Sequence, residues 1–283
     1  MARRYEDYLL ISDLDGTIVP RGKPISAANR EAIAAFTAGG GLFGIATGRT
    51  PDAAAGYVEG IAITAPSVFF NGAMLYDWQK EAVLETRPLH GTEEAPNIWA
   101  DFAAECLVMF PKACIEVYTE TSCNIISPAK NDDPRLVKEY YNVRHTTLAD
   151  VFDMEKTPWL KFFVCDAPPA LHRLERLANQ RGISSLSNHF YSEANYHDFV
   201  ARGISKGTMI EAIRRRPDCA GRKILALGDY MNDAEMLALA DVGIASGNAH
   251  ESLKQSADLV GCRAEDDLVV WLFEHFDAVE AAL

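Results

Sequence analysis

Five short apolar runs that end in small or polar residues constrain the fold of this chain more than any other feature. Helical patterns follow them. The first helix is expected to begin at Ser26, a good N-cap, and to stop at the glycines of 39–41. Short apolar runs that alternate with helices are typical of a parallel sheet covered by helices, which predicts an α/β protein with a doubly wound, Rossmann-like core. The runs are YLLISDLDG, LFGIATGR, SVFFNG, KILALGD and VGIASGN.

The middle of the chain has a different residue pattern from its two ends. It contains aromatic and charged stretches such as IWADFAAECLVMF and WLKFFVCD, which are typical of the alternating helices and strands of an α+β unit. Loops at the edge of a scaffold tolerate large insertions. We therefore predict a core of residues 1–84 and 200–283, and an inserted unit of residues 85–199; a length of 283 residues agrees with two domains.

The charge of the chain excludes several classes of partner. There are 27 Lys and Arg residues against 40 Asp and Glu residues, so the formal net charge is −13 and the pI is near 5.0. A general nucleic-acid-binding or anionic-membrane surface needs the opposite sign, and we expect neither partner. No apolar run approaches the ~18 residues of a membrane span. An anionic substrate must therefore be attracted by local positive charge.

The N-terminal residues and the cysteines indicate a cytoplasmic protein. Glu6, Asp7 and Asp13 stand where a signal peptide needs its apolar stretch. The six cysteines form no CxxC pair and the seven histidines form no HxxxH pair. We therefore expect buried free thiols, and neither zinc-site nor redox-pair spacing. The sequence does not indicate an oligomeric state.

The carboxyl ends of the predicted strands carry the polar residues that can perform chemistry. In an open parallel sheet, ligands bind beyond these ends. If the first and fourth strands are neighbours, the carboxylates of both strand ends converge. The ends are Asp13-Leu14-Asp15-Gly16-Thr17 for the first strand, Thr47-Gly48-Arg49 for the second, Asn71-Gly72 for the third and Gly228-Asp229-Tyr230-Met231-Asn232-Asp233 for the fourth.

Four converging carboxylates need a cation. Like charges about 4 Å apart repel by about 4 kcal/mol at an effective dielectric constant of 20. Carboxylate oxygens without a nearby His or Cys suit a hard divalent ion that keeps several waters. The sequence therefore predicts magnesium as the cofactor, with Asp13, Asp15, Asp229 and Asp233 as the candidate metal-binding residues.

In order and spacing, these motifs resemble the haloacid dehalogenase (HAD) superfamily of phosphatases. They are DLDGT after the first strand, a Thr at the end of the second, Lys in GISKG, and GDYMND after the fourth. The inserted unit, together with FNGA and ASGNAHESLKQSADLV, is similar to the Cof-type branch with its large cap domain. One departure is visible: members of this branch commonly carry Gly before an apolar residue near the C-terminus, whereas this chain has Asp266-Asp267-Leu268.

The resemblance implies a role for each motif residue. Asp13 is the expected nucleophile that forms an aspartyl-phosphate, and Asp15 is the expected acid and base. The side chains of Asp13 and Asp229 and the main-chain carbonyl of Asp15 are the expected metal ligands, with Asp233 in or just behind the metal shell. Lys206 is expected to balance the charge on the phosphoryl group and on Asp13. The candidate phosphate- and substrate-binding residues are Leu14, Thr47, Gly48, Asn71, Lys206 and Asn232.

We therefore expect a magnesium-dependent phosphatase that acts on small phosphorylated metabolites, with sugar phosphates as the first candidates. A sugar phosphomutase is the nearest alternative, because related enzymes share the DxDGT strand and a similar cap. Gly203 to Gly207 also fits the G-x-S-x-G nucleophile elbow, so a serine hydrolase that uses Ser205 is a remote alternative, although no HGG-type oxyanion loop precedes it. A non-catalytic binding module is disfavoured because Asp13 and Asp15 are both present.

Overall fold

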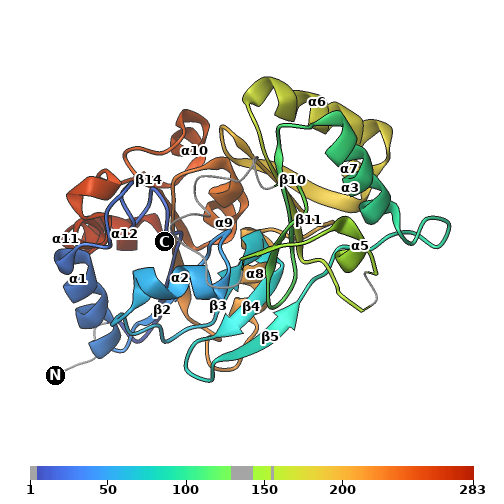
Figure 1. Ribbon diagram of the computed structural model, residues 1–283. Coiled ribbons are helices and arrows are strands. Elements are labelled where there is room, and N and C mark those ends of the chain that lie inside the picture. The colour runs from blue at the N-terminus through green and yellow to red at the C-terminus, as the bar shows by residue number, and fades with distance from the viewer. Residues whose placement is uncertain (1–4, 129–142, 154–155) are drawn as a thin grey trace. The chain divides into compact units, whose positions relative to one another are not determined.

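The structure is a computed structural model that describes residues 5–128, 143–153 and 156–283 (Figure 1). It separates into two compact units. The first, called the core unit below, comprises Met1–Glu85 and Ser205–Leu283, and the second, called the inserted unit, comprises Thr86–Ile204. Each unit has its own sheet and its own buried core.

The sheet of the core unit is parallel, as the apolar runs predict. Its five strands lie in the order β14-β13-β12-β1-β2, and every neighbouring pair is parallel. Ser12 pairs with Leu227, so β1 and β12 are neighbours and their carboxyl ends lie at the same edge. The strands are β1 (Tyr8–Ser12), β2 (Leu42–Ile45), β12 (Lys223–Gly228), β13 (Val242–Ala245) and β14 (Leu259–Val260).

Helices cover both faces of this sheet. Leu9 and Ile11 of β1 pack with apolar residues of α8, α9 and α10, while the alternate residue Leu10 is fully buried on the opposite face. A strand buried on both faces explains why each run is almost continuously apolar. The helices are α1 (Ala27–Ala38), α2 (Pro51–Val58), α8 (Lys206–Arg214), α9 (Ala234–Leu239), α10 (Glu251–Ser256), α11 (Leu268–Glu274) and α12 (Phe276–Ala282), with short 3-10 turns η1 (Phe70–Gly72), η3 (Met231–Asp233) and η4 (Ala264–Asp266).

The first helix begins and ends where the sequence predicts. The Ser26 side chain accepts a hydrogen bond from the amide of Asn29, and Ile33 and Phe36 are buried. Gly39 is the C-cap. Phe36 stacks on Phe273 of α11, with 5.2 Å between ring centres. An N-cap and one apolar face therefore explain α1 locally.

A small second sheet continues from β2 in the core unit. It has the order β3-β4-β5, with β3 at Ser67–Phe69, β4 at Met74–Asp77 and β5 at Ala82–Thr86. β3 and β4 are antiparallel, and the tight turn η1 joins them. Ala46 after β2 forms a parallel bridge to Val68. This bridge places the ends of β2 and β3 side by side.

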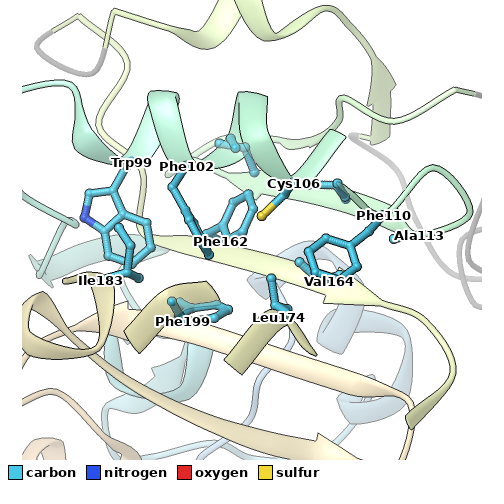
Figure 2. Packing of buried hydrophobic residues seen from close by; sticks show 14 of the residues in the cluster. Trp99, Phe102, Cys106, Phe110, Ala113, Phe162, Val164, Leu174, Ile183 and Phe199 are labelled. Carbon is cyan, nitrogen blue, oxygen red and sulfur yellow. The ribbon is translucent and has the colours of Figure 1, made fainter. Parts of the chain in front are cut away.

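The inserted unit is a six-stranded sheet covered by helices on one face. The sheet has the order β10-β11-β9-β6-β7-β8, and α3 and α6 lie on the same side of it (Figure 1). Its core contains Trp99, Phe102, Phe162 and Phe199 (Figure 2). The elements are α3 (Ile98–Met109), β6 (Cys114–Tyr118), β7 (Cys123–Ile125), β8 (Val143–His145), α5 (Leu148–Val151), β9 (Lys161–Cys165), α6 (Pro168–Gln180), α7 (Ile183–Leu186), β10 (Ser187–Glu193) and β11 (Tyr196–Ala201).

The predicted fold class, an α/β core with an inserted α+β unit, is confirmed. All six cysteines are free thiols, although Cys165 and Cys262 are only partly buried. Within the described ranges, no helix is both long enough and apolar enough to cross a bilayer.

Candidate active site

The site is built at the end of β1, where Asp13 is almost fully buried. Its amide donates to the carbonyl of Leu227 on β12, at 2.9 Å. Oδ1 accepts from Nζ of Lys206 at 2.6 Å, and Oδ2 accepts from the hydroxyl of Thr17 at 3.1 Å. Burial raises the pKa of Asp13, Lys206 lowers it, and the charge of Asp233 raises it further. The carboxylate is therefore held in place between two donors.

Lys206, from the second chain segment of the core unit, contacts the Asp13 carboxylate. Its side chain is fully buried, and Nζ donates to Asp13 and to Oδ1 of Asp233, both at 2.6 Å. Burial alone would lower the pKa of Lys206, but the two carboxylates outweigh burial and hold the pKa above its ordinary value. A charged ammonium is thus stable here because two carboxylates surround it.

Ser205 precedes Lys206 and caps the same helix. Its hydroxyl accepts a hydrogen bond from the amide of Thr208 at 3.0 Å, and its own amide donates to the Thr208 hydroxyl at 3.0 Å. This reciprocal pair is a capping box at the start of α8. The G-x-S-x-G match is therefore part of a helix start that presents Lys206.

The end of β12 supplies two more carboxylates. Oδ2 of Asp233 accepts from the amides of Asp229 and Tyr230 at 2.9 and 3.2 Å, while its Oδ1 contacts Lys206. Asp233 is fully buried. Burial raises the pKa of Asp229, and the charges of Asp13 and Asp233 raise it further. Asp229 therefore lies in an excess of negative charge that a cation would relieve.

These side chains offer a set of oxygens suited to a hard cation. One carboxylate oxygen from each of Asp13, Asp229 and Asp233 lies within 4.8 Å of the others. The set consists of oxygen atoms alone, which is what Mg²⁺ prefers. The predicted convergence of strand ends is thus observed for three of the four carboxylates. The fourth, Asp15, turns its carboxylate to a different partner.

Asp15 pairs with Arg49 from the end of β2. Nε of Arg49 donates to Oδ2 and its terminal nitrogen Nη2 donates to Oδ1, both at 2.7 Å. The Arg49 side chain is 13% exposed and that of Asp15 is 44% exposed. Between the two aspartates, the Leu14 side chain is fully buried. The Leu14 carbonyl accepts from the amides of Thr17, Ile18 and Val19. Leu14 therefore holds the turn that begins between the two aspartates.

The ends of β2 and β3 hold each other through Thr47 and Asn71. The Thr47 carbonyl accepts from the amide of Asn71 at 3.0 Å, and Oδ1 of Asn71 accepts from Nδ2 of Asn232 at 3.1 Å. A Cβ at Gly48 would lie 2.9 Å from the amide nitrogen of the Asn71 side chain, so a larger residue there would displace that amide. Thr47, Gly48, Asn71 and Asn232 are therefore neighbours, as the strand-end argument predicts.

The turn that presents Asn71 has an unusual backbone. Phe70 and Asn71 have φ values of 51° and 54°, and a left-handed conformation is costly for a side chain as large as that of Phe70. Gly72 follows with φ 111°, and a Cβ there would lie 2.2 Å from the carbonyl oxygen of Ser205. Gly72 is thus required for close packing between η1 and the start of α8.

Three residues that contact this cluster are not among the candidate residues predicted from the sequence. Thr17 contacts Asp13, and also lies 3.5 Å from Oδ1 of Asp229. Gly16 has φ 81°, and a Cβ there would lie 2.2 Å from Oδ2 of Asp229. Nδ2 of Asn248 donates to the Gly16 carbonyl at 2.7 Å. Thr17 belongs to the DLDGT motif and Asn248 to the ASGN motif, so these two motifs could have indicated both residues from the sequence.

Comparison with known proteins gives the family. The family model for haloacid dehalogenase-like hydrolases matches residues 10–273. The chain belongs to this family. The match spans both halves of the core unit and the whole inserted unit, so the HAD resemblance and its Cof-type branch are confirmed, and with them an enzyme of the hydrolase class.

Curated relatives and a solved structure agree with this HAD assignment. The chain is 27% identical over 279 residues to the pyridoxal phosphate phosphatase YbhA of Escherichia coli (strain K12), covering 93% of this chain and 96% of the relative. It is 24% identical over 289 residues to the 5-amino-6-(5-phospho-D-ribitylamino)uracil phosphatase YitU of Bacillus subtilis (strain 168), covering 95% and 97%. A haloacid dehalogenase-like hydrolase from Bacteroides thetaiotaomicron superposes with a TM-score of 0.77 at 24% identity, covering 96% and 100%.

Proposed function

We propose that this HAD hydrolase is a magnesium-dependent phosphatase that releases inorganic phosphate from small phosphorylated metabolites through an aspartyl-phosphate on Asp13. One observation carries the proposal: the buried Asp13 carboxylate is held at 2.6 Å by the equally buried Lys206, within a cluster of acidic oxygens. A carboxylate attacks a phosphate dianion only where its charge is offset, and Lys206 supplies that offset.

Lys206 and the neighbouring strand ends position the phosphoryl group. An ammonium has three N–H donors. In the part of the chain that the structure describes, two of them contact Asp13 and Asp233, and we assign the third to a phosphoryl oxygen. The Thr47 hydroxyl, the Gly48 amide and the Asn232 side chain are assigned to other phosphoryl oxygens, because they adjoin one another beyond β2 and β12.

Asp13, Asp229 and the main-chain carbonyl of Asp15 are the proposed ligands of Mg²⁺. When bound, the ion screens the negative charges of the nucleophile and the phosphate. Asp233 has both oxygens engaged, one by Lys206 and one by two backbone amides. We therefore place Asp233 behind the metal ligands, where it fixes the Asp229 loop and Lys206.

The substrate class follows from the relatives. Two of them are named phosphatases of pyridoxal phosphate and of a phosphoribitylamino-uracil, and both compounds are small phosphorylated metabolites. Sugar phosphates are compatible with this class and stay our first candidates. We propose that the inserted unit, Thr86–Ile204, acts as the cap that selects the leaving group.

A phosphate-release assay tests this function. Purified protein is incubated with a panel of phosphorylated metabolites in Mg²⁺, and inorganic phosphate is measured. We expect release that stops in excess chelator and returns when Mg²⁺ is restored. Isomerised sugar phosphate without free phosphate would indicate a phosphomutase instead. Full activity in chelator would contradict the metal assignment, and loss of activity on stoichiometric labelling of Ser205 would favour the serine hydrolase.

A further inference from the structure

The Arg49–Asp15 pair is unlike the other ion pairs of the site. Both hydrogen bonds are 2.7 Å and run from two nitrogens of one guanidinium to the two oxygens of one carboxylate. This fork geometry fixes the direction of the carboxylate as well as its distance. Asp13 and Asp233, in contrast, share the single Nζ atom of Lys206. Arg49 is therefore suited to orienting the Asp15 carboxylate.

Arg49 is itself held by two other parts of the core unit. Its guanidinium carbon lies 4.5 Å from the ring centre of Tyr57 in α2, a cation–π distance. Its amide donates to the Thr47 hydroxyl at 3.2 Å, and its carbonyl accepts from the amide of Phe70 at 3.2 Å. The main chain of Arg49 is thus anchored to the proposed phosphate-binding strand ends, and its side chain is anchored by Tyr57.

We propose that Arg49 is a positioning residue that orients the Asp15 carboxylate for the hydrolysis of the aspartyl-phosphate, and that Tyr57 keeps the guanidinium in place. This inference rests on the proposed function. In the first step, an Asp13 oxygen bonds to phosphorus, the bond from phosphorus to the leaving-group oxygen breaks, and the Asp15 carboxyl gives its proton to the leaving alkoxide. In the second step, the Asp15 carboxylate takes a proton from water while the water oxygen attacks phosphorus, the bond from phosphorus to Asp13 breaks, and phosphate leaves.

The geometry favours a role in the second step. The guanidinium uses one lone pair of each Asp15 oxygen, so each oxygen keeps a second lone pair that can accept the proton of an attacking water. Asp15 is also 44% exposed, so water can reach it. Removal of Arg49 should therefore slow hydrolysis of the phosphoenzyme more than its formation.

The test uses an activated aryl phosphate, such as 2,4-dinitrophenyl phosphate, whose leaving group departs without protonation. The variant is Arg49→Met. With this substrate, kcat/KM reports formation of the phosphoenzyme, whereas kcat includes its hydrolysis. We expect kcat to fall about tenfold or more, within the roughly 10²–10⁴-fold that a positioned base contributes. The kcat/KM value should stay within about threefold, with a rapid burst of 2,4-dinitrophenolate and accumulation of hydroxylamine-sensitive phosphoenzyme.

Three further variants make the result specific. Arg214→Met is the matched control, because Arg214 also pairs with an aspartate of the core unit, Asp241 at 2.8 Å, and it should leave both kinetic parameters unchanged. Arg49→Lys cannot form the fork and should restore only part of kcat. In the Asp15→Asn background, Arg49→Met should add little, because its partner carboxylate is gone.

Two outcomes would overturn the inference. Equal losses in kcat and kcat/KM for both Arg49 variants would show that Arg49 acts on phosphate binding or on folding, and unchanged kinetics would show that it has no role. Failure of the proposed function has a different signature: the wild-type protein itself would form no hydroxylamine-sensitive phosphoenzyme.

Discussion

At the scale of single residues, the site joins positions that are distant in the chain. Lys206 lies 193 residues after Asp13 but donates to its carboxylate at 2.6 Å. This lysine carries the positive charge that we assign to the binding of an anionic substrate. It also lies between two buried carboxylates, and removal of any one of the three charged groups would leave the others unbalanced. Conservative substitutions are therefore the informative ones.

Asp13→Asn should abolish turnover while the fold is kept. The amide has nearly the same shape as the carboxylate, but it is a poor nucleophile toward phosphorus. We expect kcat to fall by about 10³-fold or more, a loss comparable to that of other covalent-catalysis nucleophiles. Thermal unfolding checks the fold, and hydroxylamine-sensitive phosphoenzyme checks the chemistry. Acyl-phosphate accumulation in Asp13→Asn would refute the nucleophile assignment; Asp15→Asn is the comparison in which it should still form.

At the scale of elements, the C-terminal turn shows how this chain compensates for its departure from the branch pattern. Asp267 stands where the resemblance to the Cof-type branch predicts Gly, and it adopts φ 64°, in the left-handed region. Its carboxylate accepts a hydrogen bond from the hydroxyl of Ser26, the N-cap residue of α1. Aspartate is one of the few residues that tolerate this conformation. The turn therefore has the backbone that glycine favours, and the side chain links α11 to α1.

The conformation of Asp267 predicts that a glycine variant at this position is more stable than an alanine variant. Asp267→Ala loses the hydrogen bond to Ser26 and keeps the left-handed backbone, so the free energy of unfolding should fall by about 1–2 kcal/mol. Asp267→Gly loses the same hydrogen bond but relieves the backbone, so it should cost less than alanine does. Urea unfolding of both variants measures the difference. A glycine variant less stable than the alanine variant would contradict this account of the turn.

The sheet of the inserted unit contains a buried histidine pair with a consequence for pH. His197 of β11 is 1% exposed, and its Nε2 lies 3.1 Å from Nδ1 of His189 on β10. Burial lowers the pKa of His197 to about 4; the charges of His189 and His172 also lower it, and that of Asp198 opposes them. Both imidazoles are therefore expected to be neutral at pH 7 in the folded protein.

Because the folded pKa lies below the ordinary value of about 6.5, the unfolded chain binds the proton more readily. The contribution of His197 to stability is complete above pH 6.5 and declines as the pH falls toward 4, by about 2 kcal/mol at pH 5. His197→Phe, which keeps an aromatic ring beside Phe199, should weaken this pH dependence. Urea unfolding at pH 7 and pH 5 measures it; an unchanged pH dependence in the variant would contradict the assignment.

At the scale of the whole molecule, the proposed functional residues are distributed unequally between the two units. Every proposed catalytic, phosphate-binding and metal-binding residue belongs to the core unit, Met1–Glu85 and Ser205–Leu283. The inserted unit has its own sheet and a separate aromatic core. A core that binds phosphate alone cannot distinguish one metabolite from another. Discrimination should therefore come from the inserted unit.

Replacing Thr86–Ile204 by a short flexible linker tests this division. The remaining core should retain weak, magnesium-dependent cleavage of an activated aryl phosphate, because the phosphate-binding residues are all present. It should lose its preference among natural metabolites. We would measure kcat/KM for the preferred metabolite and the aryl phosphate in both proteins, with Asp13→Asn in the shortened protein as the control. An unchanged ranking of metabolites would place specificity in the core loops.

The sequence alone was sufficient to predict the parallel sheet, the start and end of α1 and the residues at each strand end. These features are encoded locally: apolar runs, N-caps and glycines act within a few residues of one another. The convergence of Asp13 and Asp229 could also be predicted, because parallel strands end at the same edge. The sequence did not determine which side chains form hydrogen bonds with one another at that edge of the sheet.

Tertiary structure decided how those side chains pair. It turned Asp15 toward Arg49, placed Lys206 between Asp13 and Asp233, and forced Phe70 and Asn71 into left-handed backbone. None of these has a local signal, since each depends on packing between segments far apart in the chain. The physical reason is that hydrogen bonds are directional. The hydrophobic periodicity of a sequence tells which face of a strand is buried, whereas the angles and distances of a hydrogen bond are set only in the packed molecule.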